Sequence, residues 1–108
     1  MALSVNQDNH ESIVKQSNKP VILDIYATWC GPCQQMTPIL EELEAEMGDQ
    51  YLFAKMNVDE GREISIKEYG VTSVPTFVFI KDGVVKGKET GYMNKEAMRS
   101  KINAAFSQ

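Results

Sequence analysis

The sequence predicts an α/β fold in which a central five-stranded sheet, mostly parallel with an antiparallel edge, is flanked by four helices. Three observations predict it. Strand-like and helix-like segments alternate along most of the 108 residues, an order that favours parallel strands joined by helices. Residues 21–27 are apolar on both alternating faces apart from Asp24, as in a central strand covered on both sides. Near the C-terminus, two strand-like segments flank an Asp-Gly turn, which predicts an antiparallel hairpin.

The first elements are a short edge strand and a helix. Residues 2–5 predict the strand. The run Asp-Asn-His-Glu at residues 8–11 has capping-box spacing and should open a helix through about residue 16. Ser-Asn-Lys-Pro at residues 17–20 ends this helix, and the central strand at residues 21–27 follows.

The middle of the chain supplies a long helix and a second central strand. From about residue 34 to residue 47 the apolar residues follow helical spacing. Pro38 lies inside this pattern and should kink the helix. Gly48 and Asp49 end the helix, and residues 51–58 predict the next strand.

The last third of the chain predicts a short helix, the hairpin and a final helix. Residues 62–68 form the short helix, which Gly70 closes. Residues 76–80 and 84–88 are the two strands of the hairpin. Asn94 caps the final helix, whose apolar residues share one face. The predicted order of elements is therefore β-α-β-α-β-α-β-β-α.

Composition and charge limit what the chain can be. With 43% apolar and 24% charged residues, residues 1–108 are expected to form one globular domain. The formal net charge is −4 and no long Lys/Arg run occurs, so no nucleic-acid partner is expected. Every apolar stretch is far shorter than the ~20 residues of a membrane span. Residues 1–8 lack the features of a signal peptide. We therefore expect a monomer in a reducing cytoplasm, although a removed leader would leave the same mature chain.

The only two cysteines lie three residues apart, in the run Trp-Cys-Gly-Pro-Cys between the central strand and the long helix. Such a pair at a strand–helix junction is a redox signature. Cys30 lies at the helix N-terminus, where free N–H groups and the helix dipole favour a thiolate, so we expect it to be the attacking nucleophile. Cys33 lies one turn inside and is the expected resolving thiol. Pro32 suits a first-turn position, where no backbone donor is lost.

These roles give a short reaction cycle. The Cys30 thiolate attacks a disulfide in a partner protein, a mixed disulfide forms, and Cys33 then attacks Cys30 to release the reduced partner. The alternatives are an inert pair or a metal site. Structural zinc needs four ligands, and the one other soft ligand is His10, on a helix expected at the surface. We expect no metal and no bound cofactor, because nothing resembles a glycine-rich dinucleotide loop.

Two further positions stand out. Asp24 lies in the central strand, six residues before Cys30. Burial there would raise its pKa and let it accept the proton of Cys33 during resolution; alternatively, its carboxylate reaches a polar edge or an ion pair. The second position is Pro75, in Val-Pro-Thr at residues 74–76. A proline can open a strand, and spacing alone favours the commoner trans bond.

Together, Trp-Cys-Gly-Pro-Cys after an Asp-bearing strand, Val-Pro-Thr some 40 residues later and the Asp-Gly hairpin resemble the thioredoxin family. The resemblance covers residues 3–106. It implies a thioredoxin-like fold and a general protein-disulfide reductase, whose redox-active disulfide is Cys30–Cys33. Electrons would pass from a separate thioredoxin reductase-type enzyme to disulfide-containing client proteins. The Gly-Pro between the cysteines resembles the reducing members.

The resemblance also implies roles for single residues. Asp24 matches the family's buried aspartate, and Lys55 matches the lysine beside it, although an exposed strand lysine is the alternative. Pro75 matches a cis-proline next to the cysteines, and the backbone of Val74 would pair with an extended substrate segment. The implied apolar docking surface consists of Trp29, Gly31, Pro32, Val74, Pro75 and Gly91.

Three residues depart from the family pattern. Gln34 follows the second cysteine, where many members have lysine, so activation of Cys30 relies more on the helix terminus. Tyr26 replaces a second tryptophan found in many bacterial members. Tyr92 stands where a small residue is common, and we expect it to narrow the docking groove or to alter partner preference.

Two other functions fit the same residues. One is an oxidant or isomerase of the same fold acting outside the cytosol. The other is a binding module or assembly subunit whose reduced face grips a partner.

Overall fold

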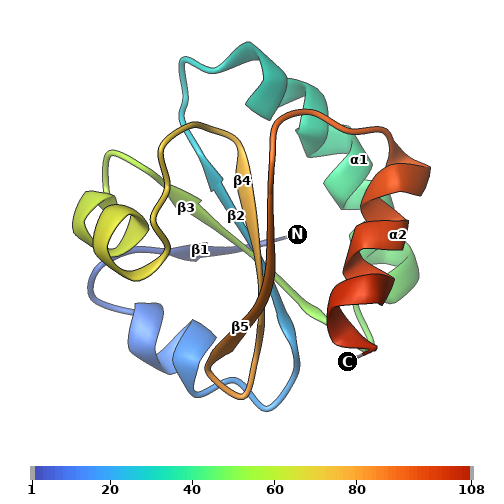
Figure 1. The fold of residues 1–108 in the computed structure, drawn as a ribbon, viewed down its shortest axis with the longest axis horizontal. Coiled ribbons are helices and arrows are strands. Elements are labelled where there is room, and N and C mark those ends of the chain that lie inside the picture. The colour runs from blue at the N-terminus through green and yellow to red at the C-terminus, as the bar shows by residue number, and fades with distance from the viewer. Residues whose placement is uncertain (1, 108) are drawn as a thin grey trace.

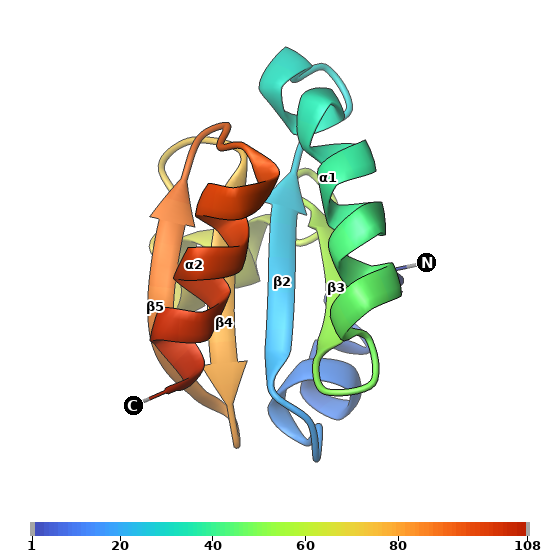
Figure 2. The same cartoon turned by 90° about the vertical axis from the view of Figure 1, so that its right-hand side faces the viewer.

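A five-stranded sheet with helices on both faces forms the protein, as the computed structural model of residues 2–107 shows (Figures 1 and 2). The strands are β1 (Leu3–Val5), β2 (Val21–Tyr26), β3 (Leu52–Asn57), β4 (Thr76–Lys81) and β5 (Val84–Thr90). The helices are η1 (Glu11–Lys15), α1 (Gly31–Met47), η2 (Ile64–Glu68) and α2 (Lys95–Phe106). The short η1 and η2 have the wider π-helical turn. In both views, α1 and α2 cover one face of the sheet and η1 and η2 lie on the other.

The predicted fold class is confirmed by the strand order, which is β1-β3-β2-β4-β5. Strand β3 pairs in parallel with both β1 and β2. Strand β4 pairs antiparallel with β2 and with β5, so the hairpin closes one side of the sheet. Because β4 alone runs against the others, the ends of β2, β3 and β5 and the start of β4 all meet at the same edge.

Two hydrophobic clusters hold the helices to the sheet, and β2 contributes to both. Ile22 packs with Met36 and Leu43 of α1 on one face. Leu23 and Ile25 pack on the opposite face. Successive side chains of a strand point to opposite faces, which explains why β2 is apolar on both sides. It also puts Asp24 on the face that carries Ile22, beneath α1.

The turn predictions for the second half are confirmed in detail. Asp82 and Gly83 have φ values of 53° and 77°, the two positive values that a tight hairpin turn requires. Asn94 caps α2, since its Oδ1 accepts a hydrogen bond of 2.9 Å from the backbone N–H of Ala97. Pro38 lies within α1 as predicted.

The predicted capping box at residues 8–11 is wrong. Asn6, which directly follows β1, accepts hydrogen bonds through its Oδ1 from the backbone N–H groups of Asp8 (2.8 Å) and Asn9 (3.0 Å). The Oδ1 of Asn9 accepts in return from the backbone N–H of Asn6 at 2.7 Å. This reciprocal pair has the three-residue spacing of a capping box, but it begins two residues earlier than the acidic residues suggest.

The expectation that His10 lies at the surface is also wrong. Its exposed fraction is 5%. The Nε2 atom of His10 lies 2.6 Å from the hydroxyl of Tyr69, and the two rings meet edge to face. This contact joins the start of η1 to the end of η2. Burial lowers the pKa of His10, opposed mainly by the carboxylate of Glu68, so the neutral ring is the favoured form.

We predict that His10 makes stability depend on pH. The folded-state pKa of His10 is lowered, so the stability that the neutral ring adds is fully present above the ordinary histidine pKa of about 6.5. This stability is lost as pH falls below that value. Compared with His10→Gln, the native protein should lose free energy of unfolding between pH 7.5 and pH 5. Urea unfolding of both proteins measures this difference. The carboxylates of Glu11 and Glu68 and the ammonium of Lys15 are present in both proteins, so their own effects on stability largely cancel in the comparison. Parallel pH profiles would contradict the prediction.

Candidate active site

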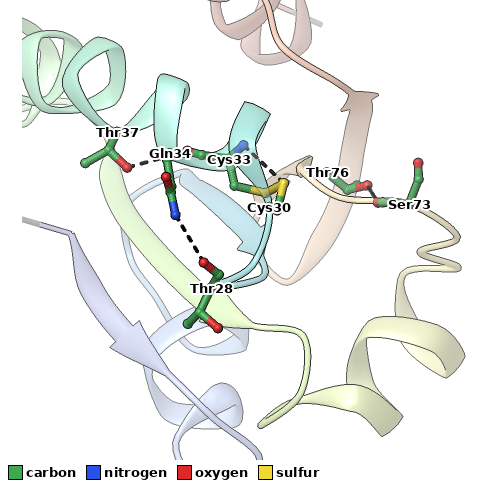
Figure 3. The surroundings of a disulfide bond; sticks show 7 residues. All are labelled: Thr28, Cys30, Cys33, Gln34, Thr37, Ser73 and Thr76. Carbon is green, nitrogen blue, oxygen red and sulfur yellow. Dashed lines mark hydrogen bonds between the residues drawn. A yellow bond between two sulfur atoms is a disulfide. The ribbon is translucent and has the colours of Figure 1, made fainter.

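Cys30 and Cys33 form a disulfide at the N-terminus of α1 (Figure 3). The helix begins at Gly31, three residues earlier than periodicity suggests, and Cys30 is its N-cap. The Sγ atom of Cys30 accepts a hydrogen bond of 3.1 Å from the backbone N–H of Cys33. Pro32 lies in the first turn, where no donor is lost. A sulfur at this position faces the N–H groups that stabilise negative charge at a helix start.

The disulfide lies in an apolar environment. The two cysteines are 6% and 5% exposed, and they pack against Ala27, with Tyr26, Val58 and Val74 around them. His10 is held by Tyr69 instead, which leaves the zinc interpretation without a third ligand. Across residues 2–107, His, Cys, Asp and Glu side chains form no group of three that could bind a metal ion.

Two side chains of α1 tie the helix start to its surroundings (Figure 3). The amide of Gln34 donates to the backbone carbonyl of Thr28 at 3.2 Å, across the loop that contains Cys30. The hydroxyl of Thr37 donates to the carbonyl of Cys33 at 3.5 Å. Gln34 therefore fixes the loop without adding charge next to the cysteines.

The segment before β4 lies beside the disulfide. The peptide bond between Val74 and Pro75 is cis, as the family resemblance implied. The hydroxyl of Thr76 donates to the carbonyl of Ser73 at 2.7 Å, and the carbonyl of Pro75 accepts from the N–H of Gly91 at 2.9 Å. Within residues 2–107, the backbone of Val74 takes part in no hydrogen bond. A short stretch of backbone is thus held in place next to Cys30 with unpaired polar groups.

An exposed surface surrounds these elements. Trp29 is 71% exposed, and Gly31 and Pro32 are exposed as well. A Cβ atom built on Gly31 or Gly91 would meet no other atom within 4 Å. The structure therefore brings the six expected docking residues to one edge, although Pro75 itself is buried, and it leaves open space in front of both glycines.

A groove lies beside the disulfide, between Trp29 and Ile66. Its volume is about 450 Å³. It is lined by Trp29, Val58, Asp59, Arg62, Ile66, Val71, Thr72, Ser73 and Val74. Arg62 and Ile66 were not among the residues expected at the site. Ile66 is an apolar residue on η2 that is 49% exposed, which its sequence position alone does not reveal.

Asp24 lines a cavity of about 160 Å³ beneath α1, together with Lys55, Tyr26 and Thr37. Its Oδ1 atom is buried and has no hydrogen-bond partner. Burial raises the pKa of Asp24 to about 7, and the nearby ammonium of Lys55 opposes the shift. Strand register explains this neighbour, since Asp24 on β2 is aligned with Lys55 on β3. The cavity thus holds a carboxyl group that can exchange a proton near neutral pH.

The chain matches the sequence model of the Thioredoxin family over residues 1–104. It is 38% identical over 105 residues to a protein named Thioredoxin from Mycolicibacterium smegmatis, which covers 96% of this chain and 94% of the relative. It is 39% identical over 102 residues to Thioredoxin from Bacillus subtilis (strain 168), covering 94% and 97%. Thioredoxin from Rickettsia felis is 37% identical over 106 residues, covering 98% and 100%.

We predict that replacing Asp24 stabilises the protein at alkaline pH. A carboxyl group whose pKa is raised from 3.8 to about 7 binds more protons in the folded state. Folding stability therefore falls as pH rises between these values, by roughly 4 kcal/mol in total at 1.36 kcal/mol per pKa unit. Asp24→Asn should raise the free energy of unfolding by up to this amount at pH 8, and far less at pH 4.

Urea unfolding of the oxidised protein at both pH values measures the effect. Glu41→Gln is the matched control, because Glu41 is an exposed carboxylate on the same cavity. An Asp24→Asn protein with the same stability gain at pH 4 and pH 8 would rule out the buried charge as its cause.

Proposed function

The chain belongs to the thioredoxin family, and we propose that this protein-disulfide oxidoreductase acts as a general reductase of disulfides in client proteins. It carries out dithiol–disulfide exchange through Cys30 and Cys33. The observation that carries the proposal is the Cys30–Cys33 disulfide at the N-terminus of α1, beside the unpaired backbone of Val74.

Cys30 is the nucleophile in this proposal. Exposure does not separate the two cysteines, since both are nearly buried in the oxidised form. Their position in the helix does: Cys30 is the N-cap, with an N–H directed at its sulfur, whereas Cys33 lies inside the first turn. Hydrogen bonding and the helix dipole favour the thiolate at Cys30.

The exchange transfers two electrons in two steps. The Cys30 thiolate attacks one sulfur of the client disulfide; a bond forms between Cys30 and the client, and the second client sulfur leaves as a thiolate that takes up a proton. Cys33 then loses its proton and attacks the Sγ of Cys30. The Cys30–Cys33 disulfide forms, the remaining client sulfur leaves as a thiolate, and the client is left as a dithiol.

Asp24 is the proposed acceptor for the proton of Cys33. Its pKa of about 7 lets it accept and release a proton at neutral pH. The cavity that it lines is also lined by Thr37, which donates to the carbonyl of Cys33. Lys55 would favour the charged form of Asp24 between turnovers, because its ammonium lowers the cost of that charge.

The docking surface accounts for broad client choice. An extended client segment would pair with the free backbone groups of Val74, in the manner of an added strand. The exposed ring of Trp29 would cover it on one side, and the open space at Gly31 and Gly91 lets client backbone approach. Pro32 completes this surface without adding charge, which suits many different client proteins, whereas Pro75 is itself buried beside Val74.

We further propose that a separate thioredoxin reductase-type enzyme returns the disulfide to the dithiol, since the sequence has no dinucleotide-binding loop. The working form is a monomer in the cytoplasm, where thiols are kept reduced. In residues 2–107, no helix has the length and apolar character needed to cross a membrane.

We predict a reduction potential near −270 mV for the Cys30–Cys33 pair, the range of reducing members of this chemistry. Trp29 is the only tryptophan and adjoins Cys30, so its fluorescence can follow the equilibrium in a thiol–disulfide buffer. A potential of about −180 to −120 mV would instead indicate an isomerase or an oxidant. If no redox transition occurred, a binding module would be the better interpretation.

We predict different defects for the two cysteine variants. Cys30→Ser should abolish reduction of insulin by dithiothreitol-recycled protein, because no nucleophile is left. Cys33→Ser should form a mixed disulfide with the substrate and hold it, because no resolving thiol is present. Non-reducing gel electrophoresis separates the trapped complex. A trapped complex with Cys30→Ser but not with Cys33→Ser would reverse the assigned roles.

A further inference from the structure

We propose that Tyr92 determines client specificity in disulfide exchange, by binding an apolar side chain of the client that lies within two residues of the attacked cysteine. This rests on the proposed function and names one feature of the clients. Three observations carry it: the exposure of the ring, the fixed backbone on both sides of it, and its position next to the free backbone of Val74.

Tyr92 is one of few large apolar side chains left in solvent. Its exposed fraction is 52%. Among residues 2–107, the others are Leu3, Trp29, Ile66, Val84 and Val85. Trp29 and Ile66 line the groove beside the disulfide, so Tyr92 is a third exposed apolar group at this end of the sheet. Within residues 2–107, its side chain makes no hydrogen bond and no ring contact.

The backbone on either side of Tyr92 is anchored. On one side, the N–H of Gly91 donates to the carbonyl of Pro75 at 2.9 Å. On the other, the N–H of Met93 lies 3.4 Å from the sulfur of Met36, a fully buried residue of α1. Figures 1 and 2 show this connection from β5 to α2 passing beside α1. An exposed ring on a fixed backbone loses little conformational entropy when it binds a partner.

The position of Tyr92 fits an extended client. A segment paired with Val74 places alternate side chains on the same face, about 7 Å apart. Gly91 is bonded to Pro75, the residue after Val74, so Tyr92 is one residue from the backbone that borders the client. The groove at Trp29 begins at Val74 as well. A client side chain next to its cysteine can therefore contact the tyrosine ring while Trp29 contacts the segment elsewhere.

The chemistry of this contact favours an apolar side chain. The next cation along the chain, Lys95, is already paired with Glu42 and Glu46, so it is not available to a client carboxylate. An aromatic ring that offers its face and one hydroxyl gains most from burying apolar surface. Truncation of a well-placed interface aromatic commonly costs tenfold or more in binding.

The test uses pairs of disulfide peptides that differ only in having Leu or Ser at one position within two residues of the attacked cysteine. Single-turnover reduction by the reduced protein, followed through Trp29 fluorescence, gives a second-order rate constant for each peptide. For at least one position, the native protein should reduce the Leu peptide about tenfold faster than the Ser peptide. Tyr92→Ala should lower this ratio to within twofold of one.

Two control variants keep the outcome specific. Tyr92→Phe keeps the ring and should keep the ratio. Val84→Ala removes an equally exposed side chain at the opposite end of β5 and should also keep it. An unchanged ratio in Tyr92→Ala, or no preference for Leu in the native protein, would overturn the proposal while leaving disulfide exchange intact. Failure of the native protein to reduce any peptide would instead overturn the proposed function itself.

Discussion

Burial of β2 on both faces is the constraint on which the rest of the molecule depends. Because apolar side chains from two clusters hold this strand, its carboxyl end is fixed, and α1 begins there at Gly31. The antiparallel neighbour β4 must then start at the same edge, which brings Pro75 to the cysteines. Strand β5 ends at the same edge, which places Gly91 there as well. A reactive pair, a free backbone segment and an exposed surface thus converge without long loops.

Strand β2 also carries Asp24, a residue that lowers the stability of the fold but suits the proposed reaction. Asp24 interrupts an apolar face beneath α1 and leaves a carboxylate oxygen without a partner, which costs free energy whenever the group is charged. Lys55 offsets only part of this cost. Strained or destabilising groups are retained where the reaction needs them, and the raised pKa of Asp24 is the property that a proton acceptor at neutral pH requires.

Most of the fold could be predicted because its signals are local in the sequence. Periodicity identified the strands and α1, the Asp-Gly turn identified the hairpin, and the cysteine spacing identified the reactive pair. One error, the capping box, is local: the reciprocal bonds join Asn6 and Asn9 instead of the acidic residues that follow. The others arise from tertiary contacts. The burial of His10 depends on Tyr69, 59 residues away. The groove at Ile66 and the anchoring of Tyr92 likewise arise from segments distant in the chain, which no local pattern reports.

Gly31 shows that folding and redox chemistry are separate constraints on this site. The residue lies between the two cysteines, yet an added Cβ would meet no atom within 4 Å outside its chain neighbours and its own helix turn. It lies in the first helical turn rather than at a left-handed position. The packing of the fold therefore does not require a glycine there. Position 31 is a place where evolution, or a designer, can change the electrochemistry of the disulfide while the architecture stays the same.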